Sequence, residues 1–215
     1  MKFHRTTMAA PFAPLSPVFK RSRFLEPSTC RQIRGAFDRG DAESAEVLGD
    51  QASVRRDIRR VISVEVDEQT LSFVERALDA VRQDLQTFFG ESLAGREGTG
   101  FLRYPPGGFY LPHRDRATVA SWPDAARRRI AIVVFLNGAL EVDPGGDFSG
   151  GYLRIYGSDT VEPEVSTDVA PAAGLLVAFR ADAWHEVTTV VGGNRDVIVD
   201  WFTEAEGLPT ASRYR

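Results

Sequence analysis

Residues 129–137, RIAIVVFLN, form an unbroken run of apolar and β-branched side chains in the second half of the chain. Such a run is typical of a strand covered on both faces, since a half-exposed strand would alternate apolar and polar residues. Shorter strand-like segments follow between glycine and proline turns, namely GYLRIYG (151–157), GLLVAF (174–179), HEVTTVV (185–191) and RDVIVDWF (195–202). From residue 100 onward the chain is therefore predicted to be rich in β-structure.

The tripeptide GGN at 192–194 separates the last two of these segments. Glycine and asparagine at such a position are a hairpin signal, because they accept the backbone dihedrals of a tight turn. We therefore expect the segments 185–191 and 195–202 to pair as neighbouring antiparallel strands. The glycine-rich stretch EVDPGGDFSGG (141–151) is expected to be a loop that leads into a strand.

The first 95 residues have a mixed and helical pattern instead. The clearest helix lies in DEQTLSFVERALDAVRQDLQTFFGESL (67–93), with Asp67 as its N-cap and Gly90 as its stop signal. Its apolar residues share one face through alternating spacings of three and four, and they are Leu71, Val74, Leu78, Val81, Leu85 and Phe88. The segment STCRQIRGAF (28–37) predicts a shorter amphipathic helix that packs Cys30 as a structural thiol.

Helices followed by many short strands predict an α+β fold, in which a β-sandwich or barrel is supported by N-terminal helices. We expect a single domain over residues 1–215. Within it, residues 1–95 would be mainly helical support, and residues 96–205 would be the β core that carries the functional site.

Composition and charge exclude several classes of partner. The chain has 43% apolar and 26% charged residues, as in an ordinary globular protein, and a formal net charge of −4. This balance gives no general attraction to nucleic acid or to an anionic membrane surface. Arginines cluster at 55–60 and at 127–129, and we interpret both clusters as solvated faces.

The single cysteine, Cys30, excludes an internal disulfide and is typical of a reducing cytosol. Residues 1–19 are interrupted by prolines before any sustained apolar run can form, so they predict neither a signal peptide nor a membrane anchor. We expect a cytoplasmic protein.

The histidines are the residues with the most informative spacing. His113 and Asp115 are two residues apart, and on a strand such a pair would point to one face and offer two ligands to one metal ion. A third ligand is needed, and only His4 and His185 remain as histidines. His4 lies near the terminus, whereas His185 begins a predicted strand. Two histidines and one carboxylate form the facial triad of non-haem Fe(II) oxygenases.

Arg195 follows His185 by ten residues and strengthens this interpretation. A guanidinium grips a carboxylate in bidentate fashion, and a buried arginine without an acidic partner is costly unless a bound anion neutralises it. We expect Arg195, Val197, Val199 and Trp201 to alternate onto one interior face. Motifs for zinc proteases, serine hydrolases, P-loops and dinucleotide binding are absent; His185-Glu186 is followed by threonine at 189, where H-E-x-x-H requires histidine.

The segments YPPGGFYLPHRD (104–115), FLN (135–137), GGYLRIYG (150–157) and WHEVTTVVGGNRDVIVDWF (184–202) together resemble the prolyl 4-hydroxylase-like 2-oxoglutarate/Fe(II)-dependent oxygenases. The resemblance extends over about residues 100–203. It implies a double-stranded β-helix core (jelly roll, cupin-like), with Fe(II), 2-oxoglutarate and O2 as cofactors and co-substrates, and ascorbate as a candidate further cofactor. By the same resemblance, the ligands of the iron are His113, Asp115 and His185.

The resemblance also assigns roles around the metal. Arg195 corresponds to the basic residue that binds the distal carboxylate of 2-oxoglutarate, and Tyr104 and Tyr110 correspond to tyrosines of the co-substrate pocket, with core packing as the alternative for both. Arg114, between the two ligands, should point away from the metal. Trp201 and Arg59 are the candidate substrate contacts, Arg59 because it lies in the arginine-rich segment 51–66 that often approaches substrate in this family.

The implied reaction couples decarboxylation of 2-oxoglutarate to succinate with hydroxylation of an unactivated C–H bond. Asp115 favours hydroxylation, since halogenating relatives lack this carboxylate. The expected substrate is a free amino acid, a peptidyl residue or a small metabolite, and no nucleic acid. Two alternatives remain: a non-enzymatic jelly-roll module that senses a metal or ligand, and a zinc-dependent hydrolase that uses the same three ligands.

Overall fold

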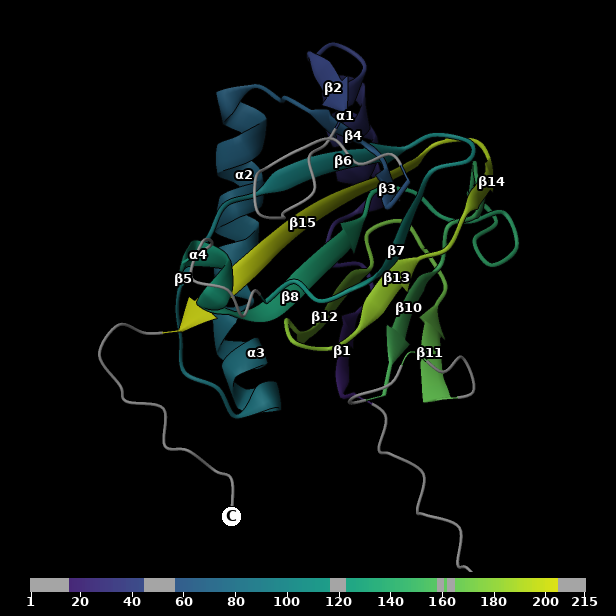
Figure 1. The fold of residues 1–215 in the computed structure, drawn as a ribbon. Coiled ribbons are helices and arrows are strands. Elements are labelled where there is room, and N and C mark those ends of the chain that lie inside the picture. Colours follow the sequence, from purple (N-terminus) through teal and green to yellow (C-terminus); the bar gives the residue numbers. More distant parts are fainter. Residues whose placement is uncertain (1–15, 45–56, 117–122, 158–160, 162–164, 205–215) are drawn as a thin grey trace, which may run out of the picture.

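The computed structural model describes residues 16–44, 57–116, 123–157, 161 and 165–204. Two antiparallel sheets face each other, and helices cover the outer side of the larger one (Figure 1). This arrangement is the predicted double-stranded β-helix with helical support. A cavity between the two sheets contains the candidate site.

The large sheet has eight strands among the described residues. In spatial order they are β1 (Val18–Arg21), β12 (Leu176–Arg180), β8 (Arg128–Phe135), β15 (Arg195–Glu204), β6 (Gly100–Tyr104), β4 (Ile62–Val64) and β2 (Ala42–Ser44), with β5 (Leu93–Arg96) beside β15. The apolar run at 129–137 thus contains most of a central strand, β8. All but one of its eight residues are buried, as its unbroken apolar character predicts.

The small sheet has five strands in the part of the chain that the structure describes. Their spatial order is β11 (Ser166–Val169), β10 (Leu153–Tyr156), β13 (His185–Val187), β7 (Phe109–His113) and β3 (Arg59–Arg60). A separate pair is formed by β14 (Val190–Gly192) and β9 (Ser149–Gly150), and β9 lies within the last part of the stretch 141–151 that was predicted to be a loop.

The described helices are α1 (Pro27–Phe37), α2 (Glu68–Ala80), α3 (Arg82–Phe89) and α4 (Pro123–Ala126). The predicted start of α2 is confirmed, because the Asp67 carboxylate accepts the backbone N–H of Thr70 at 2.8 Å. The predicted stop is also confirmed, since Gly90 ends α3 with a left-handed φ of 66°. The expected single helix is in fact two, which meet at Val81.

Alternating side chains of the large sheet build two separate cores. In β12, Leu176 and Ala178 pack with the helices, whereas Val177 and Phe179 pack between the sheets. The side chains of β8 and β15 also alternate between these two cores, so the sheet is apolar on both faces. Every second residue of β15 therefore points at the space that contains the cavity.

The predicted hairpin at 192–194 is wrong. Strand β14 pairs with β9, and β15 pairs with β5, β6 and β8, so the two segments joined by this turn do not pair with each other. Gly193 has a φ of 71°, and a Cβ there would lie 2.2 Å from the carbonyl oxygen of Asp147. Glycine is therefore needed at 193 because the backbone passes close to that of Asp147 where the chain crosses from one sheet to another. The segment HEVTTVV also forms two strands, β13 and β14, where one was expected.

The N-terminal part contributes more than helices, because strands β1 to β5 lie before residue 97 and join both sheets. That residues 1–215 form a single domain stays a prediction. No helix in the described part of the chain is both long enough and apolar enough to cross a membrane.

Cys30 lies in the helix-side core with 1% of its surface exposed, and burial raises the pKa of its thiol to about 11. We expect the native protein to resist Ellman's reagent at pH 8, because the thiol is neither accessible nor ionised. One thiol should react after unfolding in guanidinium chloride, and absorbance at 412 nm measures it. Stoichiometric reaction of the native protein within minutes would contradict this packing.

Candidate metal centre and anion pocket

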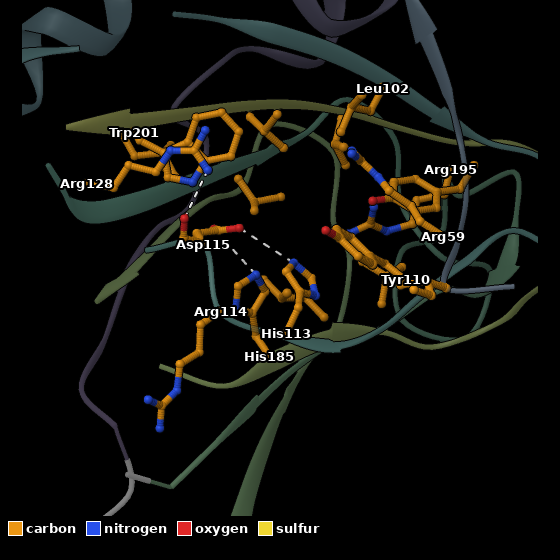
Figure 2. Close-up of a pocket in the computed structure, with 18 residues that line it drawn as sticks. Arg59, Leu102, Tyr110, His113, Arg114, Asp115, Arg128, His185, Arg195 and Trp201 are labelled. Carbon is orange, nitrogen blue, oxygen red and sulfur yellow. Dashed lines mark hydrogen bonds and ion pairs between the residues drawn. The ribbon is translucent and has the colours of Figure 1, made fainter. Parts of the chain in front are cut away.

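A cavity of about 470 Å³ lies between the large and small sheets. Its polar lining residues are Arg59, Tyr104, Tyr110, His113, Arg114, Asp115, Arg128, His185, Arg195 and Trp201. Aliphatic side chains from both sheets form the rest of the wall. All eight predicted site residues line this one cavity (Figure 2): Arg59, Tyr104, Tyr110, His113, Asp115, His185, Arg195 and Trp201.

Strand pairing brings the two histidines together. His113 at the end of β7 lies directly opposite His185 at the start of β13, and their ring centroids are 4.1 Å apart. Asp115 lies just beyond the end of β7, where its backbone N–H donates to the carbonyl of Ala181 at 3.0 Å. His113 and Asp115 therefore converge without lying on one continuous strand.

The three side chains present their ligand atoms to a common point. Nδ1 of His113 lies 2.8 Å from the carbonyl oxygen of Leu111, and Nδ1 of His185 lies 3.0 Å from that of Ala183. A carbonyl oxygen only accepts, so each Nδ1 carries a proton, and in the neutral form of each ring Nε2 then has the free lone pair. Both Nε2 atoms lie 3.5 Å from the Asp115 carboxylate, and all ligand atoms lie within 4.8 Å of one another.

The electrostatics suit a cation at this point. Burial favours the neutral form of Asp115, but His185 and His113 outweigh it and hold the pKa of this acid below its usual range. Burial and the neighbouring His113 lower the pKa of His185 to about 4. At neutral pH the set thus contains an ionised carboxylate and a neutral His185, which are the protonation states that metal ligands require.

Arg195 lies deeper in the cavity with 1% of its surface exposed. Its guanidinium lies 4.8 Å over the ring of Tyr104 and 5.0 Å over that of Phe135. Within the described residues its Nε has no hydrogen-bond partner. Burial lowers the pKa of Arg195 to about 10, so the group stays charged at neutral pH. A buried cation between two aromatic rings is suited to an anionic ligand.

The residue after Arg195 anchors this strand on the opposite face. The carboxylate of Asp196 is fully buried and accepts hydrogen bonds from Arg34 at 2.8 Å and from Arg103 at 2.7 Å. Asn137 accepts the backbone N–H of Asp196 at 2.9 Å. These contacts tie β15 to α1, β6 and the end of β8, and they hold Arg195 at the cavity.

The remaining predicted residues surround the histidines. The ring of Tyr110 stacks on that of His113 at 3.5 Å, and the guanidinium of Arg59 lies 4.7 Å over Tyr110. Burial raises the pKa of Tyr110 to about 12. Arg114 points away from the triad, as expected (Figure 2). Its guanidinium lies 4.9 Å over the ring of Trp184. His4, together with the arginines at 55 and 56, lies outside the described residues.

The interpretation of 127–129 as a solvated face is wrong for Arg128, which has only 6% of its surface exposed and lines the cavity. Strict alternation along β8 would place it with Ile130 on the helix side. However, the pairing of β15 with β8 shifts register between Phe202 and Thr203, and such bulges redirect side chains. The sequence carries no signal for this shift, so Arg128 was missed.

A family model described as the 2OG-Fe(II) oxygenase superfamily matches residues 99–203, which contain the three candidate ligands and Arg195. This match covers just under half of the chain, and it indicates a 2OG-Fe(II) oxygenase domain. The oxygenase is thus an oxidoreductase, and its family implies Fe(II), 2-oxoglutarate and O2. The match therefore supports neither of the two alternative functions, a non-enzymatic sensor module and a zinc-dependent hydrolase. A comparison with curated protein sequences found no match.

Solved structures agree with the family. A prolyl 4-hydroxylase from Pseudomonas putida is 25% identical to this oxygenase, with a TM-score of 0.65 over 88% of this chain and 94% of that one. A prolyl hydroxylase from Trichoplax adhaerens, solved with a hypoxia inducible factor peptide fragment, is 20% identical, with a TM-score of 0.67 over 87% and 83%. A viral collagen prolyl hydroxylase from Paramecium Bursaria Chlorella virus-1, solved with 2OG, is 17% identical, with a TM-score of 0.58 over 88% and 96%. The predicted prolyl 4-hydroxylase-like fold is confirmed.

Replacing Asp196 by alanine in this oxygenase should lower the free energy of unfolding by about 3 kcal/mol or more, because two partly buried arginines lose the fully buried carboxylate that they share. Asp38→Ala is the matched control, since the Asp38 side chain also accepts from Arg103 but is 68% exposed. Its loss should cost less than about 1 kcal/mol. Urea denaturation measures the free energy of unfolding of both variants. An equal decrease in the two would contradict the anchoring role of Asp196.

Proposed function

We propose that this oxygenase hydroxylates an unactivated C–H bond of an amino acid, a peptidyl residue or a small metabolite. The supporting observation is the convergence of the three ligand atoms within 4.8 Å beside a buried arginine. In this proposal His113, Asp115 and His185 hold Fe(II). The donor set fits that ion, because two imidazoles and one carboxylate on one side leave the other side open.

Arg195 would bind the distal carboxylate of 2-oxoglutarate, with Tyr104 bordering the same pocket. Bound there, iron and 2-oxoglutarate supply O2-dependent oxidation of a C–H bond, with succinate and carbon dioxide as co-products and ascorbate as the proposed reductant. The protein places the co-substrate, keeps His185 neutral and surrounds the reacting bond with Tyr110 and Trp201 to exclude water.

Anaerobic addition of Fe(II) and 2-oxoglutarate should produce a visible metal-to-ligand charge-transfer band. His185→Ala should abolish the band. Arg195→Ala should raise the dissociation constant of 2-oxoglutarate about 100-fold, because a charge-assisted pair in a buried site is lost. Titration followed by absorbance measures both effects.

Arg180→Ala provides the control, because Arg180 pairs with Glu91 outside the cavity and its side chain is 40% exposed. This variant should give the band and the affinity of the unmodified protein. The absence of a band from the unmodified protein, or an unchanged band in His185→Ala, would refute the proposed function.

We further propose that Arg59 receives a carboxylate of the substrate, since its guanidinium lies at the cavity over Tyr110. Substrates that carry a carboxylate should then stimulate succinate release, and their primary amides should not. Arg59→Ala should raise KM for an active acid by about 10-fold or more, while KM for 2-oxoglutarate stays the same. Equal stimulation by acid and amide would exclude this role.

A further inference from the structure

Arg128, the first residue of β8, contacts the backbone of the acidic ligand. Its Nη1 donates to the carbonyl oxygen of Asp115 at 3.0 Å, which Figure 2 shows as a dashed line. Its guanidinium also lies 3.9 Å over the ring of Trp201. The Arg128 side chain is 7% exposed, so these contacts are made away from bulk water.

Glu97 determines the orientation of this guanidinium. Both carboxylate oxygens of Glu97 accept from Arg128, one from Nε and the other from Nη2. The bidentate pair leaves Nη1 directed at Asp115, and it neutralises the arginine. The charge of Arg128 is therefore already matched within the protein, in contrast to that of Arg195.

Glu97 is itself held by β15. Its backbone N–H donates to the carbonyl of Trp201 at 2.9 Å. The next two residues bind the fully buried carboxylate of Asp200, through the backbone N–H of Gly98 at 3.3 Å and the hydroxyl of Thr99 at 2.8 Å. The loop that carries Glu97 is thus fixed to the same strand that carries Arg195.

The acidic ligand depends on these contacts because it lies past the end of its strand. Strand β7 ends at His113, so no sheet ladder holds Asp115. Its backbone is attached at two points, through its N–H to Ala181 and through its carbonyl to Arg128. The first contact is between main chains, whereas the second comes from a side chain that mutation can remove.

We propose that Arg128, oriented by Glu97, is a positioning residue that holds Asp115 in place to bind the metal. This inference rests on the proposed function, since it assumes that Asp115 is a ligand. Lysine cannot replace the arginine, because its ammonium lacks the planar fork that pairs with Glu97, stacks on Trp201 and still donates to Asp115. Loss of a contact that orients a ligand typically weakens metal affinity 10- to 100-fold.

The test is an anaerobic titration of the full-length protein with Co(II), followed by its visible d–d spectrum. Arg128→Gln and Arg128→Lys should raise the dissociation constant of Co(II) about 10- to 100-fold and change the spectrum. Glu97→Gln, which keeps the arginine but loses the ion pair, should give a smaller increase. With metal at saturation, the affinity for 2-oxoglutarate should change less than about threefold, since the Arg195 pocket is intact.

Arg129→Gln is the matched control. Arg129 is the next residue of the same strand and pairs with Glu204, but it does not line the cavity. This variant also loses a partly buried ion pair, yet it should bind Co(II) as the unmodified protein does. Thermal melting of each metal-free variant shows whether it is folded, and Glu97→Gln provides the test if Arg128→Gln melts below the assay temperature.

A Co(II) dissociation constant within twofold of the unmodified value in folded Arg128→Gln would overturn the proposal. So would equal weakening in Arg129→Gln, because a general loss of stability would then explain the effect. Failure of the unmodified protein to bind Co(II) would instead refute the metal site itself, and with it this inference. Weakening confined to the Arg128 and Glu97 variants supports the positioning role.

Discussion

Strand β15 presents its side chains alternately to two environments, and both the core and the candidate site depend on this alternation. Ile198 and Phe202 pack with the helices, while Arg195 and Trp201 face the cavity. A shift of one residue would exchange the faces and expel the arginine from its pocket. The acids Asp196 and Asp200 prevent such a shift, because each is fully buried against arginines that only one register brings within reach.

The small sheet provides the two histidines of the candidate metal centre. The pairing of β7 with β13 places His113 opposite His185, and backbone carbonyls keep their Nε2 atoms directed at Asp115. The deeper Arg195 comes from the other sheet, so the candidate metal ligands and the buried Arg195 guanidinium reach the cavity from opposite walls. The charged groups are held in place by protein contacts, which reduces the reorganisation that ligand binding requires.

Local rules of sequence explain the elements that were predicted correctly. Asp67 and Gly90 mark helix ends because capping depends on neighbouring residues only, and 129–137 is identified as a buried strand by its own apolar run. The roles of the triad and of Arg195 follow from the resemblance to a family and not from a local rule, and they stay predictions. The pairing of strands after 192–194 was predicted wrongly, because the same glycine that suits a hairpin also suits a crossover, and contact with Asp147 decides between them.

The sequence by itself determined the β-rich class, the helix caps and the residue types able to hold a metal and an anion, since each follows from local pattern or short spacing. Only the tertiary structure decided which strands pair, how Asp115 is held beyond the end of β7, and that Arg128 turns into the cavity. These features depend on a register shift between β8 and β15 and on contacts with Glu97, Trp201 and Ala181. Such contacts join residues that are distant in sequence, and no local pattern specifies them.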